Sequence, residues 1–111
     1  MPELTSGLTM REVHISEQVF EKISELELYL QVELKFSKEA ARKRSDRMRV
    51  FLKTLSNPAD YALCRFKRWR MLGYRCVVFE NSWVFAYEIF DDGVIVRDMS
   101  HTTALGELYI E

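Results

Sequence analysis

Three apolar runs between residues 73 and 101 decide the fold: GYRCVVF (73–79), WVFAYEIF (83–90) and VIVRDMSH (94–101). Each run is rich in β-branched and aromatic residues, and the polar breaks ENS (80–82) and DDG (91–93) separate them. Runs of this length between turn residues are typical of β-strands, and Asp-Gly is a strong hairpin signal. The sequence therefore predicts a three-stranded antiparallel meander.

Upstream of the meander, hydrophobic periodicity predicts a short strand over residues 10–15 and two amphipathic helices. Ser16 is the expected N-cap of the first helix, of roughly 18–20 residues, and Ser37 caps the second. Asn57-Pro58 ends the second helix, because proline disfavours helix in the residue before it. The short joint between the helices implies an antiparallel pair. We therefore expect an α+β fold: an N-terminal strand, an antiparallel helix pair, then the three-stranded meander, with the helices on one sheet face.

The length of 111 residues suits a single domain over residues 1–111, with residues 1–9 as a loose lead-in. The sequence has no apolar run long enough to span a membrane and no signal-peptide pattern, so we expect a cytoplasmic protein that does not contact membranes. Its two cysteines, Cys64 and Cys76, are too few for a disulfide framework or a metal site. We expect each to be a small buried hydrophobe, and we expect no metal and no cofactor.

Charge is segregated along the chain, although the net charge is only −1. Residues 37–75 contain 12 of the 16 Lys and Arg but 3 of the 17 Asp and Glu, so this segment carries +9 and the rest of the chain −10. Such asymmetry indicates an anionic partner for the middle segment.

Within that segment, RFKRWR (65–70) interleaves basic residues with aromatic residues. This pattern is typical of surfaces that bind nucleic acid or acidic protein. In an extended conformation, alternation places Arg65, Lys67 and Trp69 on one side. The alternative is a loop whose aromatic rings dock on the core and whose charges keep it solvated.

The meander has two different faces. On its central strand, alternation puts Trp83, Phe85, Tyr87 and Ile89 on one side, and we assign this larger aromatic face to the helices. With Asp92-Gly93 as a two-residue turn, Glu88 faces Arg97 and Val84 faces His101. The other face then collects a mostly apolar set: Arg75, Val77, Phe79, Val84, Ala86, Glu88, Phe90, Ile95, Arg97, Met99 and His101. An exposed apolar sheet face of this size predicts a partner-binding surface.

A small polar cluster interrupts that face: Arg75, Glu88, Arg97 and His101. Glu and His can act as general base and acid, and Arg can stabilise developing negative charge. These are the components of metal-independent RNA cleavage. The alternative is a structural ion pair between Glu88 and Arg97, with a histidine at the sheet edge.

The strand motifs resemble those of the RelE/ParE toxin superfamily of bacterial type II toxin–antitoxin systems, the plasmid stabilisation family. They are Gly73-x-Arg75, Trp83-x-Phe85-x-Tyr87 and Ile95-x-Arg97-x-Met99-x-His101, in the order strand, helix, helix, basic connection, meander. The resemblance covers the chain from about residue 10. It implies a compact toxin that a cognate antitoxin wraps and neutralises, with an oligomeric toxin–antitoxin complex left open.

The superfamily has members that cut mRNA on the ribosome and members that poison DNA gyrase. The chain departs from the mRNA-cutting pattern, because Val77 replaces a base, Val84 replaces the catalytic Arg, and the tail after His101 lacks an Arg, although Tyr109 is a candidate for the terminal Tyr. The resemblance therefore implies a ParE-like, growth-arresting gyrase inhibitor. The first alternative is a ribosome-dependent mRNA endonuclease that uses Glu88, Arg97 and His101, with Arg75 beside them. The second is a non-toxic protein-binding domain.

For the gyrase inhibitor, the expected contact residues for target and antitoxin come from the apolar sheet face and the basic connection. They are Val77, Phe79, Val84, Phe90, Met99, Arg65, Lys67, Arg68, Trp69 and Arg70.

Overall fold

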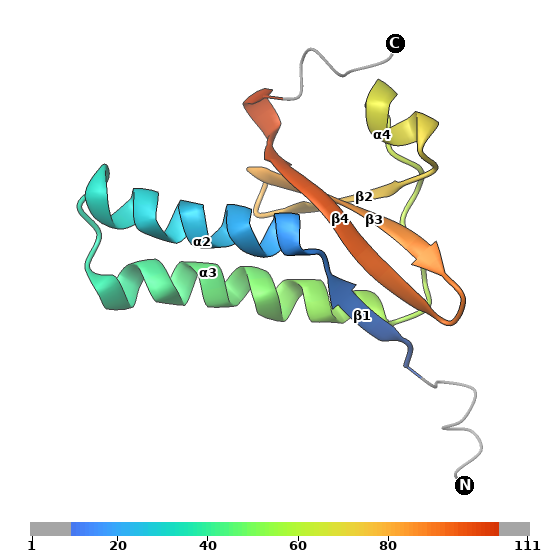
Figure 1. Cartoon of the computed structure of the whole chain (residues 1–111), viewed down its shortest axis with the longest axis horizontal. Helices are drawn as coiled ribbons and strands as arrows, with labels where there is room; N and C mark the ends of the chain where they lie inside the picture. Colours follow the sequence, from blue (N-terminus) through green and yellow to red (C-terminus); the bar gives the residue numbers. More distant parts are fainter. Residues whose placement is uncertain (1–9, 105–111) are drawn as a thin grey trace, which may run out of the picture.

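The computed structural model describes residues 10–104 and confirms the predicted α+β architecture (Figure 1). The lead-in over residues 1–9 and the candidate terminal Tyr109 lie outside the described residues. The elements follow in the order β1 (Glu12–Ile15), α2 (Glu17–Val32), α3 (Lys38–Lys53), a 3₁₀ turn (Thr54–Ser56), α4 (Lys67–Met71), β2 (Arg75–Phe79), β3 (Trp83–Phe90) and β4 (Gly93–His101).

The helix pair begins where its caps predict. The Ser16 hydroxyl accepts a hydrogen bond from the backbone N–H of Val19, and the Ser37 hydroxyl accepts one from the backbone N–H of Ala40. Each serine satisfies one of the N–H groups that a helix start leaves unpaired. Helices α2 and α3 then run antiparallel, side by side (Figure 1).

The sheet contains the predicted meander and one further strand pairing. Its order is β1-β4-β3-β2, with β2, β3 and β4 antiparallel and β1 parallel to β4. A parallel pairing needs a crossover, and the chain from β1 to β4 runs through the helix pair, α4, β2 and β3. Gly93 lies opposite Glu12 at this junction, and a Cβ at Gly93 would come within 2.9 Å of the Glu12 carbonyl oxygen. Close approach of the β1 backbone therefore requires glycine there.

The predicted register of β3 and β4 is wrong. Phe90 pairs with Gly93, so the two-residue turn is Asp91-Asp92, and Glu88 consequently faces Ile95. Farther from the turn, Tyr87 pairs with Val96 but Ala86 pairs with Asp98, so one extra residue, Arg97, forms a β-bulge. A bulge reverses the alternation beyond it, and this places His101 opposite Trp83 on the helix-covered face.

The predicted face of β2 is also wrong. Val77 pairs with Phe85, and Phe79 pairs with Trp83 across the three-residue break. Directly paired residues share a face, so Val77 and Phe79 lie under the helices and not on the opposite side. The aromatic face was correctly assigned to the helices: Phe85 and Tyr87 are buried in the main core. The remaining buried members of that core are Val19, Ile23, Met48, Leu52, Leu55, Val77, Phe79, Val94, Val96 and Met99.

A second, smaller core lies on the opposite face of the sheet. Trp69 of α4 packs there with Val84, Ala86 and Cys64. The segment predicted as a connection contains a short helix, so the alternation expected for an extended conformation does not apply to it. Its aromatic rings dock on the core, as the alternative expected. Both aromatic rings of that segment turn inward, with Phe66 and Trp69 in an edge-to-face contact at 5.9 Å.

Cys64 and Cys76 form a disulfide, which corrects the prediction of two unpaired cysteines. The chain before α4 runs antiparallel to β2, with Leu63 opposite Arg75, and this brings the two Cα atoms to 4.8 Å. That separation lies within the range a disulfide requires. The sequence did not indicate this bridge. The two cysteines are 12 residues apart, and the short helix between them was not predicted.

A polar network joins the start of the connection to the sheet. The Tyr87 hydroxyl donates to the Asp60 carboxylate at 3.1 Å and accepts from the Tyr61 N–H at 3.0 Å. Arg11 also pairs with Asp60, and its hydrogen bond lowers the pKa of that carboxyl. Burial raises the pKa of Tyr87. The network fixes the chain as it leaves the helix pair.

Candidate functional site

The four residues of the predicted catalytic cluster lie in three different places. Arg97 and Glu88 are together: the Arg97 Nε donates to Glu88 Oε1 at 2.8 Å. This pair is on the sheet face away from α2 and α3, because Glu88 alternates with Tyr87, which is buried beneath those helices. Both side chains are partly exposed, at 40% for Arg97 and 34% for Glu88, so the arrangement is an ordinary surface ion pair.

His101 and Arg75 are not part of that pair. The His101 ring contacts the Trp83 ring edge to face, with centroids 5.0 Å apart, on the helix-covered side of the sheet. Its Nδ1 lies 2.9 Å from the Thr103 hydroxyl. Arg75 lies on the edge strand and donates to the Tyr61 carbonyl oxygen at 2.6 Å. The register of the sheet and the bulge at Arg97 therefore separate the predicted cluster.

The apolar sheet face that was predicted to be open to a partner is largely covered by helices. Val77, Phe79 and Met99 are buried under the helices, and Val84 is buried beneath α4. Phe90 alone among these five predicted sheet contacts is exposed, at 52%. From the basic connection, Trp69 is buried, whereas Arg65, Lys67, Arg68 and Arg70 are exposed.

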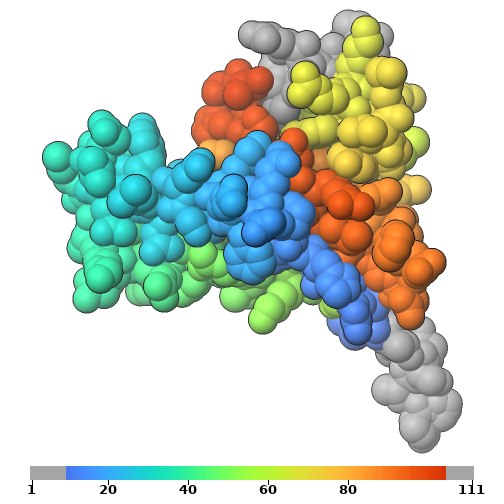
Figure 2. All heavy atoms as spheres, viewed as in Figure 1, coloured from blue at the N-terminus to red at the C-terminus, as the bar shows by residue number. Residues whose placement is uncertain are grey.

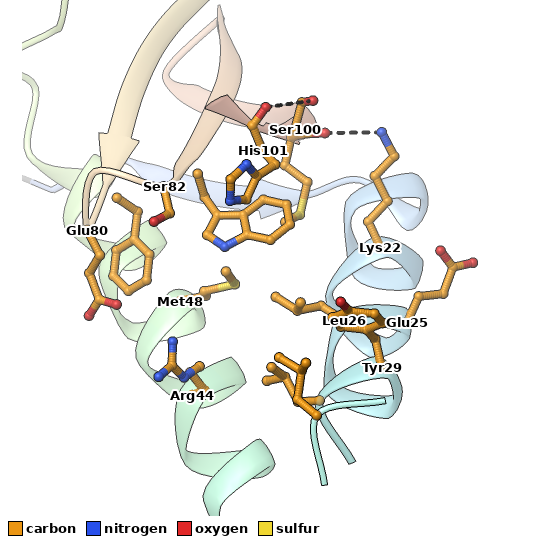
Figure 3. Close-up of a pocket in the computed structure, with 15 residues that line it drawn as sticks. Lys22, Glu25, Leu26, Tyr29, Arg44, Met48, Glu80, Ser82, Ser100 and His101 are labelled. Atoms are coloured by element: carbon orange, nitrogen blue, oxygen red, sulfur yellow. Dashed lines mark hydrogen bonds between the residues drawn. The ribbon is translucent and has the colours of Figure 1, made fainter. Parts of the chain in front are cut away.

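The structure instead shows an apolar groove of about 720 Å³ between the helix pair and one end of the sheet (Figure 3). Helices α2 and α3 have 16 residues each, and the far end of the pair projects beyond the sheet (Figures 1 and 2). The groove opens where the helices are no longer covered by strands. It is lined by Lys22, Glu25, Leu26, Tyr29, Leu30, Leu34, Arg44, Met48, Phe79, Glu80, Ser82, Trp83, Met99, Ser100 and His101.

Apolar side chains from both helices and from the sheet form the floor of this groove. Leu26 of α2 and Met48 of α3 point into it from opposite sides (Figure 3). Phe79 and Trp83 close the end formed by the turn between β2 and β3. The groove therefore offers a hydrophobic surface to an incoming side chain.

Two of the charged residues at the rim, Lys22 and Glu80, are bound by other protein groups. Lys22 donates to Asp98 at 2.8 Å and to the Met99 carbonyl oxygen at 3.1 Å. Glu80 is held by two hydrogen bonds from Arg47, a residue of α3. Glu25 and Arg44 also lie at the rim, with the Arg44 guanidinium 5.3 Å from the centre of the Phe36 ring. The groove therefore combines an apolar floor with a charged rim.

The described residues contain no group of three or more His, Cys, Asp or Glu arranged to hold a metal ion. Among the same residues, no helix is long and apolar enough to cross a membrane. In the described part of the chain, the predicted acid and base lie apart, and the groove beside the helix pair has an apolar floor.

Sequence reasoning missed the groove because it placed every apolar residue of the helices against the sheet. The available signal was the width of the α2 stripe. Tyr29 of α2 and Leu34, just beyond its end, continue the apolar pattern but remain about half exposed, at 49% and 50%. A stripe that continues past the length of a short sheet leaves apolar residues for another contact.

No family model, no curated protein and no solved structure matches the chain.

Proposed function

We propose that the chain is a ParE-like toxin of a type II toxin–antitoxin module, which arrests bacterial growth by binding DNA gyrase and is neutralised by a cognate antitoxin. The strand motifs that resemble the RelE/ParE superfamily support this proposal. The order of strand, helix pair, connection and meander is the one that the resemblance implies. A gyrase target implies a cytoplasmic location, where Cys64 and Cys76 would encounter reducing conditions.

One observation favours binding over RNA cleavage: Glu88 and His101 lie on opposite faces of the sheet. A general acid and a general base must both come within hydrogen-bond reach of the reacting atoms. Side chains on opposite faces of one sheet cannot meet the same phosphodiester. The separation of Glu88 and His101 therefore supports the binding proposal over the ribonuclease alternative.

The groove between the helix pair and the sheet is the proposed contact surface for a protein partner, antitoxin or gyrase. Phe79 and Met99, two of the expected contact residues, line it. Tyr29 and Leu34 at its rim supply exposed apolar surface that a partner can bury. Burial of apolar area at such a surface is favourable by roughly 25 cal/mol per Å² before the costs of association.

The test is inducible expression of the chain in a susceptible bacterium that lacks an antitoxin. We expect growth arrest with an SOS response and accumulation of gyrase-linked DNA breaks. Arrest with translated mRNA cut within codons and without an SOS response would reject the gyrase proposal and support a ribonuclease. Unhindered growth at high expression would support the non-toxic binding domain.

A pair of matched variants tests the groove itself. Tyr29→Ser with Leu34→Ser should abolish growth arrest, because both residues line the groove. Leu28→Ser with Val32→Ser should leave it intact, because these α2 residues are equally exposed, at 59% and 52%, but do not line the groove. Equal loss in both variants would show that the groove is not the contact.

A further inference from the structure

Helix α4 and the residues at its two ends form a second surface of distinct chemistry, on the opposite side of the sheet from the helix pair. The disulfide and Trp69 hold this segment against Val84 and Ala86. The indole N–H of Trp69 also donates to Asp98 at 3.3 Å. A five-residue helix is too short to be stable alone, so these anchors fix its orientation.

The fixed orientation presents three uncompensated cations. Lys67, Arg68 and Arg70 are exposed, and their side chains make no ion pair or hydrogen bond with any residue between 10 and 104 that the structure describes. The sequence has no Asp or Glu between Asp60 and Glu80. Helix α3 shows the contrast, because three of its arginines are paired with carboxylates: Arg42 with Glu27, Arg47 with Glu80 and Arg49 with Asp46.

Large apolar side chains are exposed beside these cations. Leu63 precedes the helix and is 46% exposed, and Met71 and Leu72 at its end are 77% and 56% exposed. The combination of cations and exposed aliphatic groups discriminates between partners. A nucleic-acid backbone requires the cations but gains nothing from aliphatic side chains, and Trp69, which could stack on a base, is buried at 3% exposure.

We propose that the α4 surface, consisting of Leu63, Lys67, Arg68, Arg70, Met71 and Leu72, docks a peptide segment of a protein partner in which acidic and aliphatic residues are mixed. Charge complementarity selects the acidic residues and increases the association rate, and the aliphatic contacts add affinity. The surface is separate from the groove. The proposal concerns the chain with its Cys64–Cys76 disulfide formed, because this bridge helps to hold α4 against the sheet.

The test uses the full chain with its disulfide formed and measures fluorescence anisotropy of labelled probes. The first probe is a fluorescein-labelled ten-residue peptide of alternating Glu and Leu. The second replaces every Glu with Lys, and the third is a labelled 12-base-pair DNA duplex. We expect the acidic peptide to bind with a dissociation constant in the micromolar range and to bind more tightly than either other probe.

Two charge variants locate the binding. Lys67→Gln, Arg68→Gln and Arg70→Gln together should weaken the acidic peptide about tenfold, as expected for three exposed ion pairs. The control, Lys38→Gln, Lys43→Gln and Lys53→Gln on α3, removes the same charge from exposed positions and should change affinity less than about twofold. Circular dichroism of each variant checks the fold.

Three results would overturn the proposal: no saturable binding of the acidic peptide, equal weakening in the two charge variants, or tighter binding of the duplex. Tighter binding of the duplex would identify the surface as a nucleic-acid contact. Met71→Ser should also weaken the acidic peptide while leaving duplex binding unchanged, which tests the aliphatic part of the surface independently.

Discussion

Removing the Cys64–Cys76 disulfide should destabilise the protein by about 3 kcal/mol. The bridge joins residues 12 apart in sequence, and closing a loop of that length in the unfolded chain costs about this much entropy. The closed segment contains α4, whose remaining anchors are Trp69 and a few backbone hydrogen bonds. The loss should therefore be accompanied by local opening of α4.

Urea unfolding of three samples measures this effect: oxidised protein, reduced wild-type protein and the Cys64→Ala, Cys76→Ala variant. The reduced wild type isolates the cross-link, because it keeps both side chains, whereas the variant also loses their packing. Hydrogen exchange should accelerate in residues 65–74 and stay slow in β3. A reduced protein within about 0.5 kcal/mol of the oxidised one, or two thiols titrating in the native oxidised protein, would refute the reasoning.

Three other predictions concern single positions. Gly93→Ala should cost about 1–3 kcal/mol in urea unfolding, because the new Cβ would meet the β1 backbone at 2.9 Å; an unchanged midpoint would refute the close approach. Asp60→Asn should remove part of the acid sensitivity. The hydrogen bond from Arg11 lowers the pKa of Asp60 in the folded state, so the ionised carboxylate stabilises the fold above the pKa that it has in the unfolded chain. This stabilisation is lost as pH falls below about 4. The free energies of unfolding of the wild type and the variant should therefore differ above that pH and converge below it. Trp69→Phe should cost about 1–2 kcal/mol, because it removes the N–H that donates to Asp98, and thermal unfolding of both proteins would show a matching decrease in midpoint.

Local signals in the sequence were sufficient to predict the strands and the helix pair, but not α4. Ser16 and Ser37 marked the helix starts, because a capping side chain acts within one turn of its own position. The polar breaks at residues 80–82 and 91–93 marked the strand ends, because turn residues also act on the backbone close to their own position. The parallel pairing of β1 with β4 depends on a contact between distant segments, and no residue pattern near β1 indicated it.

The site could not be predicted because it depends on register. One extra residue at Arg97 reverses the side of every later residue of β4, so His101 moved from the predicted open face to the helix-covered one. The ion pair of Glu88 and Arg97 survived the change, because long side chains tolerate a shifted register. The groove and the disulfide both arise where segments extend past or return to the sheet, and only their three-dimensional arrangement shows this.

The most direct test of the proposed function is a DNA cleavage assay with purified components. Purified chain is added to DNA gyrase, ATP and supercoiled plasmid, and the DNA is analysed after detergent and protease treatment. A binding-type gyrase poison predicts accumulation of linear plasmid, which persists with Glu88→Ala, a residue outside the groove, and disappears with Tyr29→Ser, Leu34→Ser. Intact plasmid at every concentration, together with ribosome-dependent cleavage of mRNA that requires Glu88 or His101, would contradict the proposal.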